Sequence, residues 1–529
     1  MKIIKTLAVI FAFILLFTAC GKVADNTPDY EATEIILSDG VIRVDGNDVS
    51  ADPAEAVYIA NDIVYYESGK DLTYGEGAEK DAHTKDEADA HTVVHITKAG
   101  NYSISGKLSK GQIAVNLGEG AKENPEAKVT LILNGVDITC EVAPAVIFYN
   151  VYECGNTDAD NATKDVDTTN AGANIIIADG TVNNVNGSYV EKIYKADTVV
   201  LNEDKTQVED AKKLHKYDAA FYSKMSMNVT GETDGSGILN INAKNEGLDS
   251  ELHLTINGGN INIISGNDGI NTNEDGVSVT TVNGGTLKIN VSGETGEGDG
   301  IDSNGWLVIN GGTVVASACS FSADAGIDSD MGIHINGGTV IATGNMLDRI
   351  EDGGQTYAVF NFAKKQQGAE TIRLKTNDSD TVLEHKVEND YSILIYSSPD
   401  LKEGTYTLWN GEKQLASYSG GMMNMRPGGF KPDGEIPEGM TPPELPEGKE
   451  MPTRPDRPEN GDFPEGQEPP TGDIPPEGFE PPKGEERPER PEGNMQRHDD
   501  FGETAGELTA EFKIINGANM FMGVKEYTE

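Results

Sequence analysis

The sequence is poor in aromatic residues, in cysteine and in positive charge. Aromatic residues make up 6% of its 529 residues, which argues against a few large aromatic cores. Thin β-layers with many tight turns fit the 61 glycines better. The 41 Lys and Arg stand against 88 Asp and Glu, giving a formal net charge of -47. Because nucleic-acid phosphates need clustered cations, we expect no nucleic-acid partner; a carbohydrate, a cation or a basic partner fits this charge.

The sequence also lacks an apolar run that could span a bilayer, which takes ~20 residues. Residues 7–17 form a shorter apolar run that ends in Thr-Ala-Cys20-Gly, and this run is typical of a signal peptide. Its end resembles a bacterial lipobox, although Phe17 stands where Leu is usual. We therefore expect a lipoprotein signal peptide at 1–20, a lipid on Cys20 that anchors the protein to the cell membrane outside the cytoplasm, and a tether at 21–33. A plain secretory signal is the alternative.

Three further cysteines, Cys140, Cys154 and Cys319, are too few to suggest a disulfide framework. Cys140 and Cys154 could pair in an oxidising compartment. They could equally stay reduced and buried in β-turns, and the sequence leaves both readings open.

An internal repeat occupies residues 218–345. Asn-Gly-Gly recurs there with its Asn at 257, 283, 310 and 336, in steps of 26, 27 and 26 residues. Each unit has two or three short strands and is too small to bury its apolar face, so it must stack on its neighbours. Strands that recur in the same order stack in parallel, whereas a β-propeller blade needs ~40 residues. We predict an all-β protein with a parallel β-helix over 34–420, in which alternate apolar residues face inward: Leu254, Ile256, Leu307, Ile309, Ile333 and Ile335.

The composition changes after this region. Eighteen of the 23 prolines lie within 421–500, among repeated Glu and Gly. Such a segment buries too little apolar surface to fold, so we predict a disordered acidic insertion at 421–505. The alternating pattern returns at its end, and we expect 506–529 to pack a closing strand on the β-helix.

Acidic residues recur at one turn of the repeat. Residues 218–345 contain 16 Asp and Glu, three Lys and no Arg. In a stack of coils, equivalent residues lie about 4.8 Å apart, and rows of carboxylates at that spacing repel unless a cation lies between them. Oxygen ligands and Gly-rich turns suit Ca²⁺. The alternative is that Asp and Asn serve only as turn formers. The candidate metal ligands are Glu246, Asp249, Asp268, Asn271, Asp299, Asp302, Asp324 and Asp328.

No catalytic pattern stands out in the repeats. Pectate-type lyases typically use a cationic base, often Arg; the repeats contain no Arg, and their three Lys are scattered. Glycoside hydrolysis needs paired carboxylates, but these abound by composition and discriminate nothing. His253 and His334 alternate with apolar residues, so we expect them on the surface. Trp306 could face outward and stack on a sugar, or belong to the core, and both readings stay open.

Several segments resemble the bacterial carbohydrate-binding domain-containing protein family. They are residues 96–106, 129–135 and 218–224, together with the Gly-Ile-Asp-Ser and Asn-Gly-Gly coils. The resemblance covers about 34–420 and the final strand. It implies a right-handed parallel β-helix like that of pectate lyases, which binds Ca²⁺ and acidic, pectin-type polysaccharide without demonstrated cleavage. It also implies cation sites at Asp249, Asp302 and Asp328, while Asn271 departs from the pattern.

The sequence thus predicts a non-catalytic, monomeric, cell-surface polysaccharide-binding lipoprotein. Calcium would bridge its acids to acidic sugars such as polygalacturonate, because a bound cation inverts the local charge. Two alternatives stay open. One is a polysaccharide lyase or hydrolase on the same scaffold, and the other is a structural surface protein or adhesin.

Overall fold

The computed structural model describes residues 31–155, 157–418 and 507–528, all within one compact unit. The predicted signal peptide with Cys20, most of the tether and the insertion at 421–505 lie outside the described residues. The rest is built from strands, with one short α-helix, α1 (Lys85–Asp89), and four 3-10 turns. The prediction of an all-β protein is therefore confirmed.

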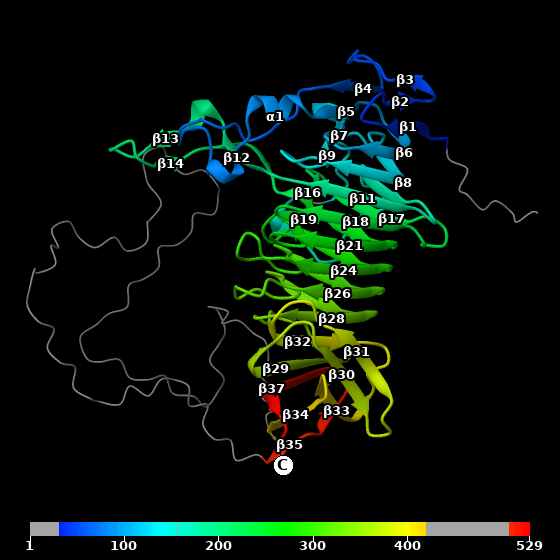
Figure 1. Ribbon diagram of the computed structural model, residues 1–529, viewed down its shortest axis with the longest axis vertical. Coiled ribbons are helices and arrows are strands. Elements are labelled where there is room, and N and C mark those ends of the chain that lie inside the picture. The colour runs from blue at the N-terminus through cyan, green and yellow to red at the C-terminus, as the bar shows by residue number, and fades with distance from the viewer. Residues whose placement is uncertain (1–30, 156, 419–506, 529) are drawn as a thin grey trace, which may run out of the picture. The chain divides into compact units, whose positions relative to one another are not determined.

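The strands of each coil pair in parallel with the equivalent strands of the next coil and so form three ladders. Figure 1 shows successive strands of a ladder one above another. The first ladder contains β17 (Met227–Gly231), β20 (Leu254–Ile256), β23 (Val279–Val282), β25 (Trp306–Ile309) and β27 (Gly332–Ile335). The second contains β18 (Ile238–Ala243), β21 (Asn260–Ser265), β24 (Thr286–Val291), β26 (Thr313–Ser317) and β28 (Thr339–Gly344). The third contains β9 (Val146–Asn150), β16 (Ala219–Ser223), β19 (Glu246–Ser250) and β22 (Ile270–Thr272).

The same parallel pairing begins before the repeat. β6 (Gly100–Leu108) pairs with β8 (Val129–Thr139), and β8 pairs with β10 (Ala173–Ile177) and β11 (Val182–Gly187). These two strands continue into the first and second ladders through β17 and β18. Parallel stacking therefore extends over residues that show no regular repeat in the sequence.

The register between coils places equivalent residues over one another. In the first ladder one apolar row faces the core, and each member is at most 1% exposed: Val229, Ile256, Val282, Ile309 and Ile335. The Asn of each Asn-Gly-Gly also stacks. The side-chain amides of Asn283, Asn310 and Asn336 donate to the amide oxygen of the Asn one coil earlier, at 2.8, 2.9 and 2.8 Å.

The second Gly of each Asn-Gly-Gly allows the coils to approach closely. Gly285 has φ 81°, and a Cβ on it would lie 2.5 Å from the carbonyl oxygen of Gly259. A Cβ on Gly312 would likewise lie 2.7 Å from the carbonyl oxygen of Gly285. Any side chain here would force the coils apart, which explains why the motif keeps glycine.

The parallel stacking of successive coils ends at β28, well short of residue 420. β28 pairs in antiparallel fashion with β32 (Tyr391–Ser397), and the later strands surround a second core in which the rings of Phe360 and Phe521 stack and Phe512 packs edge-on against both. β37 (Ala518–Glu526) returns to this end and pairs with β29 (Tyr357–Gln366). The change coincides with the last Asn-Gly-Gly at 336–338.

Among the described residues, no helix is long and apolar enough to cross a membrane. The thiols of Cys140, Cys154 and Cys319 are free, and Cys140 and Cys319 are buried.

Replacing Leu287 with Ala should lower the free energy of unfolding by about 2–5 kcal/mol, because its buried side chain, 1% exposed, packs between coils. Lys288 is the next residue of β24 and is exposed, so Lys288→Ala should change stability by about 0.5 kcal/mol or less. Urea unfolding followed by circular dichroism measures both. Equal effects of the two substitutions would show that β24 does not present alternate residues to the core.

Candidate functional site: stacked carboxylates

The predicted ligands fall into two columns along the third ladder and the turns that continue it. Leu248, Ile270, Ile301 and Ile327 are 0% exposed and fill the core, so the residue after each points to the opposite side. These next residues form the Asp249 column: Asp249, Asn271, Asp302 and Asp328. The register pairs Asp249 with Asn271, and the backbone N–H groups of Asp302 and Asp328 donate to Ile270 and Ile301 of the preceding coils.

The second set contains Glu246, Asp268, Asp299 and Asp324. The first three share one position of the coil and form the Asp268 column, whereas Ala325 takes that position in the next coil and Asp324 precedes it. Three carboxylates of this set accept backbone N–H groups of neighbouring coils. Asp268 Oδ1 accepts from Asp299 at 2.7 Å, Asp299 Oδ1 from Ala325 at 2.5 Å, and Asp324 Oδ2 from Gly298 at 2.6 Å. These bonds join residues of different coils, so these three side chains hold neighbouring coils together.

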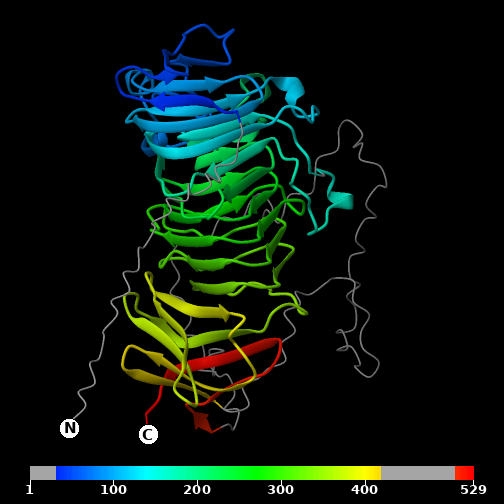
Figure 2. The same ribbon diagram turned by 90° about the vertical axis from the view of Figure 1, so that its right-hand side faces the viewer.

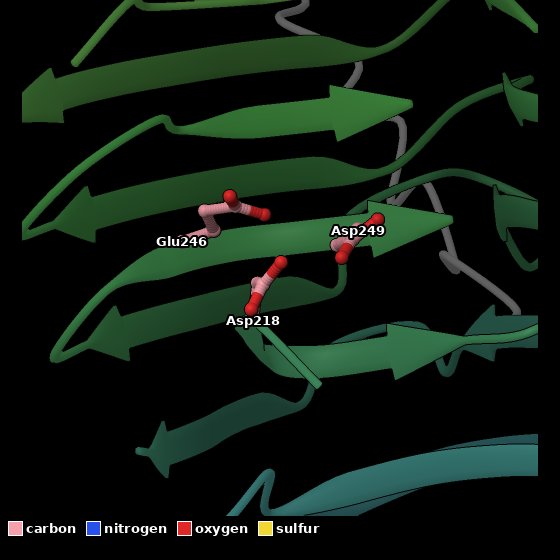
Figure 3. Close-up of side chains that lie close together, drawn as sticks. All are labelled: Asp218, Glu246 and Asp249. Atoms are coloured by element: carbon pink, nitrogen blue, oxygen red, sulfur yellow. The ribbon is translucent and has the colours of Figure 1, made fainter. Parts of the chain in front are cut away.

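A buried carboxylate cluster lies where the two columns begin. Asp218, Glu246 and Asp249 each place a carboxylate oxygen within 4.8 Å of the others, and they are 5%, 5% and 0% exposed. Figure 3 shows the three side chains close together. Glu246 and Asp249 belong to β19, while Asp218 precedes β16 in the coil before. Such a group of acids, closed off from water, could hold a metal ion.

Several oxygens around this cluster have no partner in the described part of the chain. Asn271 donates to Glu246 Oε1 at 3.3 Å, and Asn273 donates to Asp249 Oδ1 at 2.9 Å. The other carboxylate oxygens, Glu246 Oε2 and Asp249 Oδ2, are buried without a hydrogen bond, as is the amide oxygen of Asn271. Buried oxygens without a donor are rare, because desolvating them is costly, and these oxygens are available to a cation or to another donor.

One cation approaches the cluster. Lys216 Nζ lies 2.7 Å from Asp218 Oδ2. Burial lowers the pKa of Lys216, but the charge and hydrogen bond of Asp218, together with the charges of Glu246 and Glu191, outweigh burial and raise the pKa above its ordinary value. Lys216 is therefore protonated, and a single positive charge faces three carboxyl groups.

The electrostatics of both columns disfavour ionised carboxylates without a cation. Burial, and then the charge of Asp249, raise the pKa of Glu246 well above its ordinary value, and burial followed by Asp218 does the same for Asp249. Burial together with Asp302 raises the pKa of Asp268 to about 8, and burial together with Asp268 raises that of Asp299 to about 9.

The pKa values are raised less at the half-buried end of the Asp249 column. Burial, with Asp330 next, raises the pKa of Asp302 to about 6. Burial, with Asp348 next, raises that of Asp328 to about 7. Asp348 Oδ2 also accepts the backbone N–H of Ser329 at 3.1 Å, so this residue extends the acidic group beyond the predicted set.

Sequence reasoning missed Asp218 as a member of the cluster. Its coil lacks Asn-Gly-Gly, so the spacing of the repeat does not reach it. The register reveals its place, because the backbone N–H of Glu246 donates to the carbonyl of Asp218. The signal in the sequence is its position one coil before Glu246, directly ahead of an apolar strand.

The expectation for His253 was wrong. It was placed on the surface by alternation, but it is 1% exposed, because Gly155 and its neighbours cover it. Alternation along a strand says which side a residue faces and not whether another segment covers that side. Trp306, at the equivalent position of β25, is partly exposed, as is His334 on β27.

Comparison with known proteins identifies the family of this chain. The model of the carbohydrate-binding domain-containing protein family matches residues 90–170 and 159–381, which is more than half of the chain. The protein therefore belongs to the carbohydrate-binding domain-containing protein family. No curated protein matches the sequence. Among solved structures, a polysaccharide lyase-like protein from C. thermocellum, in a gadolinium derivative, is similar with 18% identity and a TM-score of 0.31, over 59% of this chain and 90% of that chain.

The raised pKa values predict an unusual dependence of stability on pH when a chelator removes metal ions. Between pH 5 and pH 9 the folded state holds protons that the unfolded state has lost near pH 4, so the free energy of unfolding falls as pH rises. Each such proton contributes at most about 1.4 kcal/mol per pH unit. The double variant Glu246→Gln/Asp249→Asn should therefore be more stable than the wild type at pH 8, and its melting temperature should fall less with pH.

Glu294→Gln is the matched control, because Glu294 is an exposed acid in a turn of the same region. It should follow the wild-type curve of melting temperature against pH in the chelator. A double variant that is less stable than the wild type at pH 8 would mean that the two carboxylates stabilise the metal-free fold, contrary to this electrostatic account.

Proposed function

We propose that the protein is a non-catalytic polysaccharide-binding protein of the cell surface, in which bound calcium bridges the buried acids to acidic sugars. The observation that carries this proposal is the cluster of Asp218, Glu246 and Asp249, whose oxygens lie within 4.8 Å of one another and are partly unpartnered. Membership in a carbohydrate-binding family supplies the polysaccharide partner.

The donor set of the cluster fits calcium. Ca²⁺ takes six to eight oxygen ligands and tolerates irregular geometry, while Mg²⁺ requires a strict octahedron. The residues that would hold the ion are Asp218, Glu246 and Asp249, with the free amide oxygen of Asn271. His and Cys, which favour zinc, are not among these donors. A second region at Asp302 and Asp328 offers the same ligand type, and Asp328 Oδ1 is also without a partner.

Calcium would explain how an acidic protein binds an acidic polymer. At a net charge of -47 the protein repels polygalacturonate unless positive charge is fixed at the contact. A bound divalent ion supplies that charge. The protein's own contribution is to hold several carboxylates in register at one edge of the coils, so that they remain in place when the sugar arrives.

We interpret the three parallel ladders as the three faces of a right-handed β-helix, the architecture of pectate lyases. The regular coil of 26 or 27 residues and the stacked Asn and Gly positions support this interpretation. An extended stack of coils presents rows of identical side chains, which suit a polymer with a repeating unit.

A lyase on the same scaffold is the alternative. Its reaction needs a base that is neutral at working pH and sits beside the bound uronate. Lys216 lies beside the cluster, but its pairing with Asp218 keeps it protonated. This residue therefore serves better as a partner of the acids than as a base, which favours binding without turnover.

Titration calorimetry with hexagalacturonate tests the proposal. The wild type should bind with calcium present and show no heat in chelator. Glu246→Gln/Asp249→Asn should lose at least about tenfold in affinity, because two ligands of the ion lose their charge. Glu294→Gln should bind like the wild type. Equal binding in chelator would contradict the calcium bridge, and a steady rise in unsaturated-product absorbance would contradict a function without catalysis.

We also propose that Cys20 carries a lipid that anchors the protein outside the cytoplasm. Support comes from the lipobox-like sequence at 16–21, which lies outside the described residues. Cys20→Ser should abolish incorporation of labelled fatty acid and move the protein from the membrane fraction to the soluble fraction. Unchanged labelling of the variant would exclude Cys20 as the acylated residue.

A further inference from the structure

A groove lies on the outer side of the first ladder, away from the carboxylate columns. Its volume is about 420 Å³, and it is bounded on one side by the segment 164–169. Figure 2 shows this part of the chain, which follows η3 (Ala159–Asn161), beside the strands of later coils. The floor contains Thr281 of β23 and Val308 of β25, and the opposite wall is the row of stacked asparagines.

The segment that bounds the groove is fixed to the coils. Thr168 Oγ1 donates to Thr255 Oγ1 at 2.7 Å, and the side-chain amide of Asn228 donates to the carbonyl of Thr168 at 2.7 Å. Earlier in the chain than this segment, Glu153 accepts hydrogen bonds from the backbone N–H and the hydroxyl of Ser226, both at 2.7 Å. These bonds join residues 60 or more positions apart, so the groove is formed before any ligand arrives.

The asparagine wall repeats one hydrogen-bonding unit along the stack. Asn257, Asn283, Asn310 and Asn336 are exposed, and each of the last three donates one N–H to the oxygen of the one before. An amide has two N–H donors and two acceptor lone pairs, so one donor and one acceptor of each interior Asn remain available. They recur at the coil spacing of about 4.8 Å, which is on the order of the length of one sugar ring in a chain.

This pattern complements the hydroxyl groups of a saccharide chain. Neighbouring ring hydroxyls each donate and accept a hydrogen bond, as does each interior Asn. Val308 lines the floor but is 5% exposed, so hydrogen bonds to the asparagine row would provide most of the contact. A ligand lying along the stack would meet the same contact in each coil.

The charges of the groove distinguish its ligand from that of the carboxylate columns. Lys164 Nζ pairs with Asp165 Oδ1 at 2.5 Å, so its charge is compensated within the protein. Asp167 accepts the backbone N–H of Thr169 at 3.0 Å and leaves the groove slightly acidic. The floor and the asparagine wall are uncharged. A polyuronate would find no free cation here, whereas an uncharged saccharide has no charge to desolvate.

We propose that this groove binds an uncharged saccharide chain along the row of Asn257, Asn283, Asn310 and Asn336, independently of calcium. The site is separate from the carboxylate columns, and it rests on the proposed function only in taking polysaccharide as the ligand. The protein would then contact two kinds of polymer on two sides of the same coils.

Titration calorimetry in chelator, with cellohexaose, xylohexaose and mannohexaose as probes, tests this site. The wild type should bind at least one of them, and calcium should not change the affinity. Asn283→Ala/Asn310→Ala should weaken binding by about tenfold or more, because the hydrogen bonds of two Asn side chains to the ligand are lost. Thr281→Trp should abolish binding by filling the groove, with the asparagine row intact.

A second asparagine row gives a matched control. Asn240 donates to Asn184, and Asn262 donates to Asn240, both at 2.9 Å, on the second ladder. Asn240→Ala/Asn262→Ala removes the same kind of bonds away from the groove. It should lower the melting temperature about as much as Asn283→Ala/Asn310→Ala, and it should bind the neutral probe like the wild type.

The outcomes separate this inference from the proposed function. If hexagalacturonate binds with calcium but none of the neutral probes binds, the groove inference is overturned and the calcium proposal stands. If a neutral probe binds equally well to Thr281→Trp or to Asn283→Ala/Asn310→Ala, the groove is not its site and the inference also falls. If a neutral probe binds as expected while hexagalacturonate does not bind, the inference stands and the calcium proposal falls.

Discussion

The register between parallel coils determines where every functional group of this protein lies. Backbone hydrogen bonds hold each strand directly over the equivalent strand of the coil before, at about 4.8 Å. A residue type that recurs at one position of the repeat therefore becomes a row. Rows of Ile and Val fill the core, rows of Asn bond to one another, and rows of Asp and Glu form the two acidic columns. Core packing and site geometry thus have the same cause.

Rows of carboxylates are unfavourable in this arrangement unless something neutralises them. Asp249 is 0% exposed and Glu246 5%, and each has an oxygen without a partner in the described part of the chain. In the absence of a cation, burial and then the charge of neighbouring acids raise the pKa of several members toward or above neutrality, so that protonation relieves both costs. Buried acids that lower the stability of the metal-free fold are typical of sites where the binding free energy of a ligand offsets that loss. The apolar rows beside the acidic columns keep the coils in register whether or not a metal ion is bound.

Much of the fold follows from the sequence because the repeat is short and regular. Asn-Gly-Gly at steps of 26 or 27 residues predicts parallel stacking, and the glycine at 285 has the positive φ and the close approach that the motif requires. The two acidic columns follow from the same spacing. What the repeat does not contain could not be predicted. Asp218 precedes the regular units, and His253 is covered by a segment from elsewhere in the chain. The antiparallel end after β28 depends on long-range contacts among aromatic residues.

The central claim is that a metal ion occupies the cluster of Asp218, Glu246 and Asp249. The most direct test is an anomalous difference map from crystals grown with calcium, recorded at a long wavelength where calcium scatters anomalously. The account predicts a peak about 2.3–2.6 Å from carboxylate oxygens of these three residues, absent from crystals of Glu246→Gln/Asp249→Asn. Well-ordered carboxyl groups bonded only to water or to one another, with no anomalous peak at saturating calcium, would contradict it.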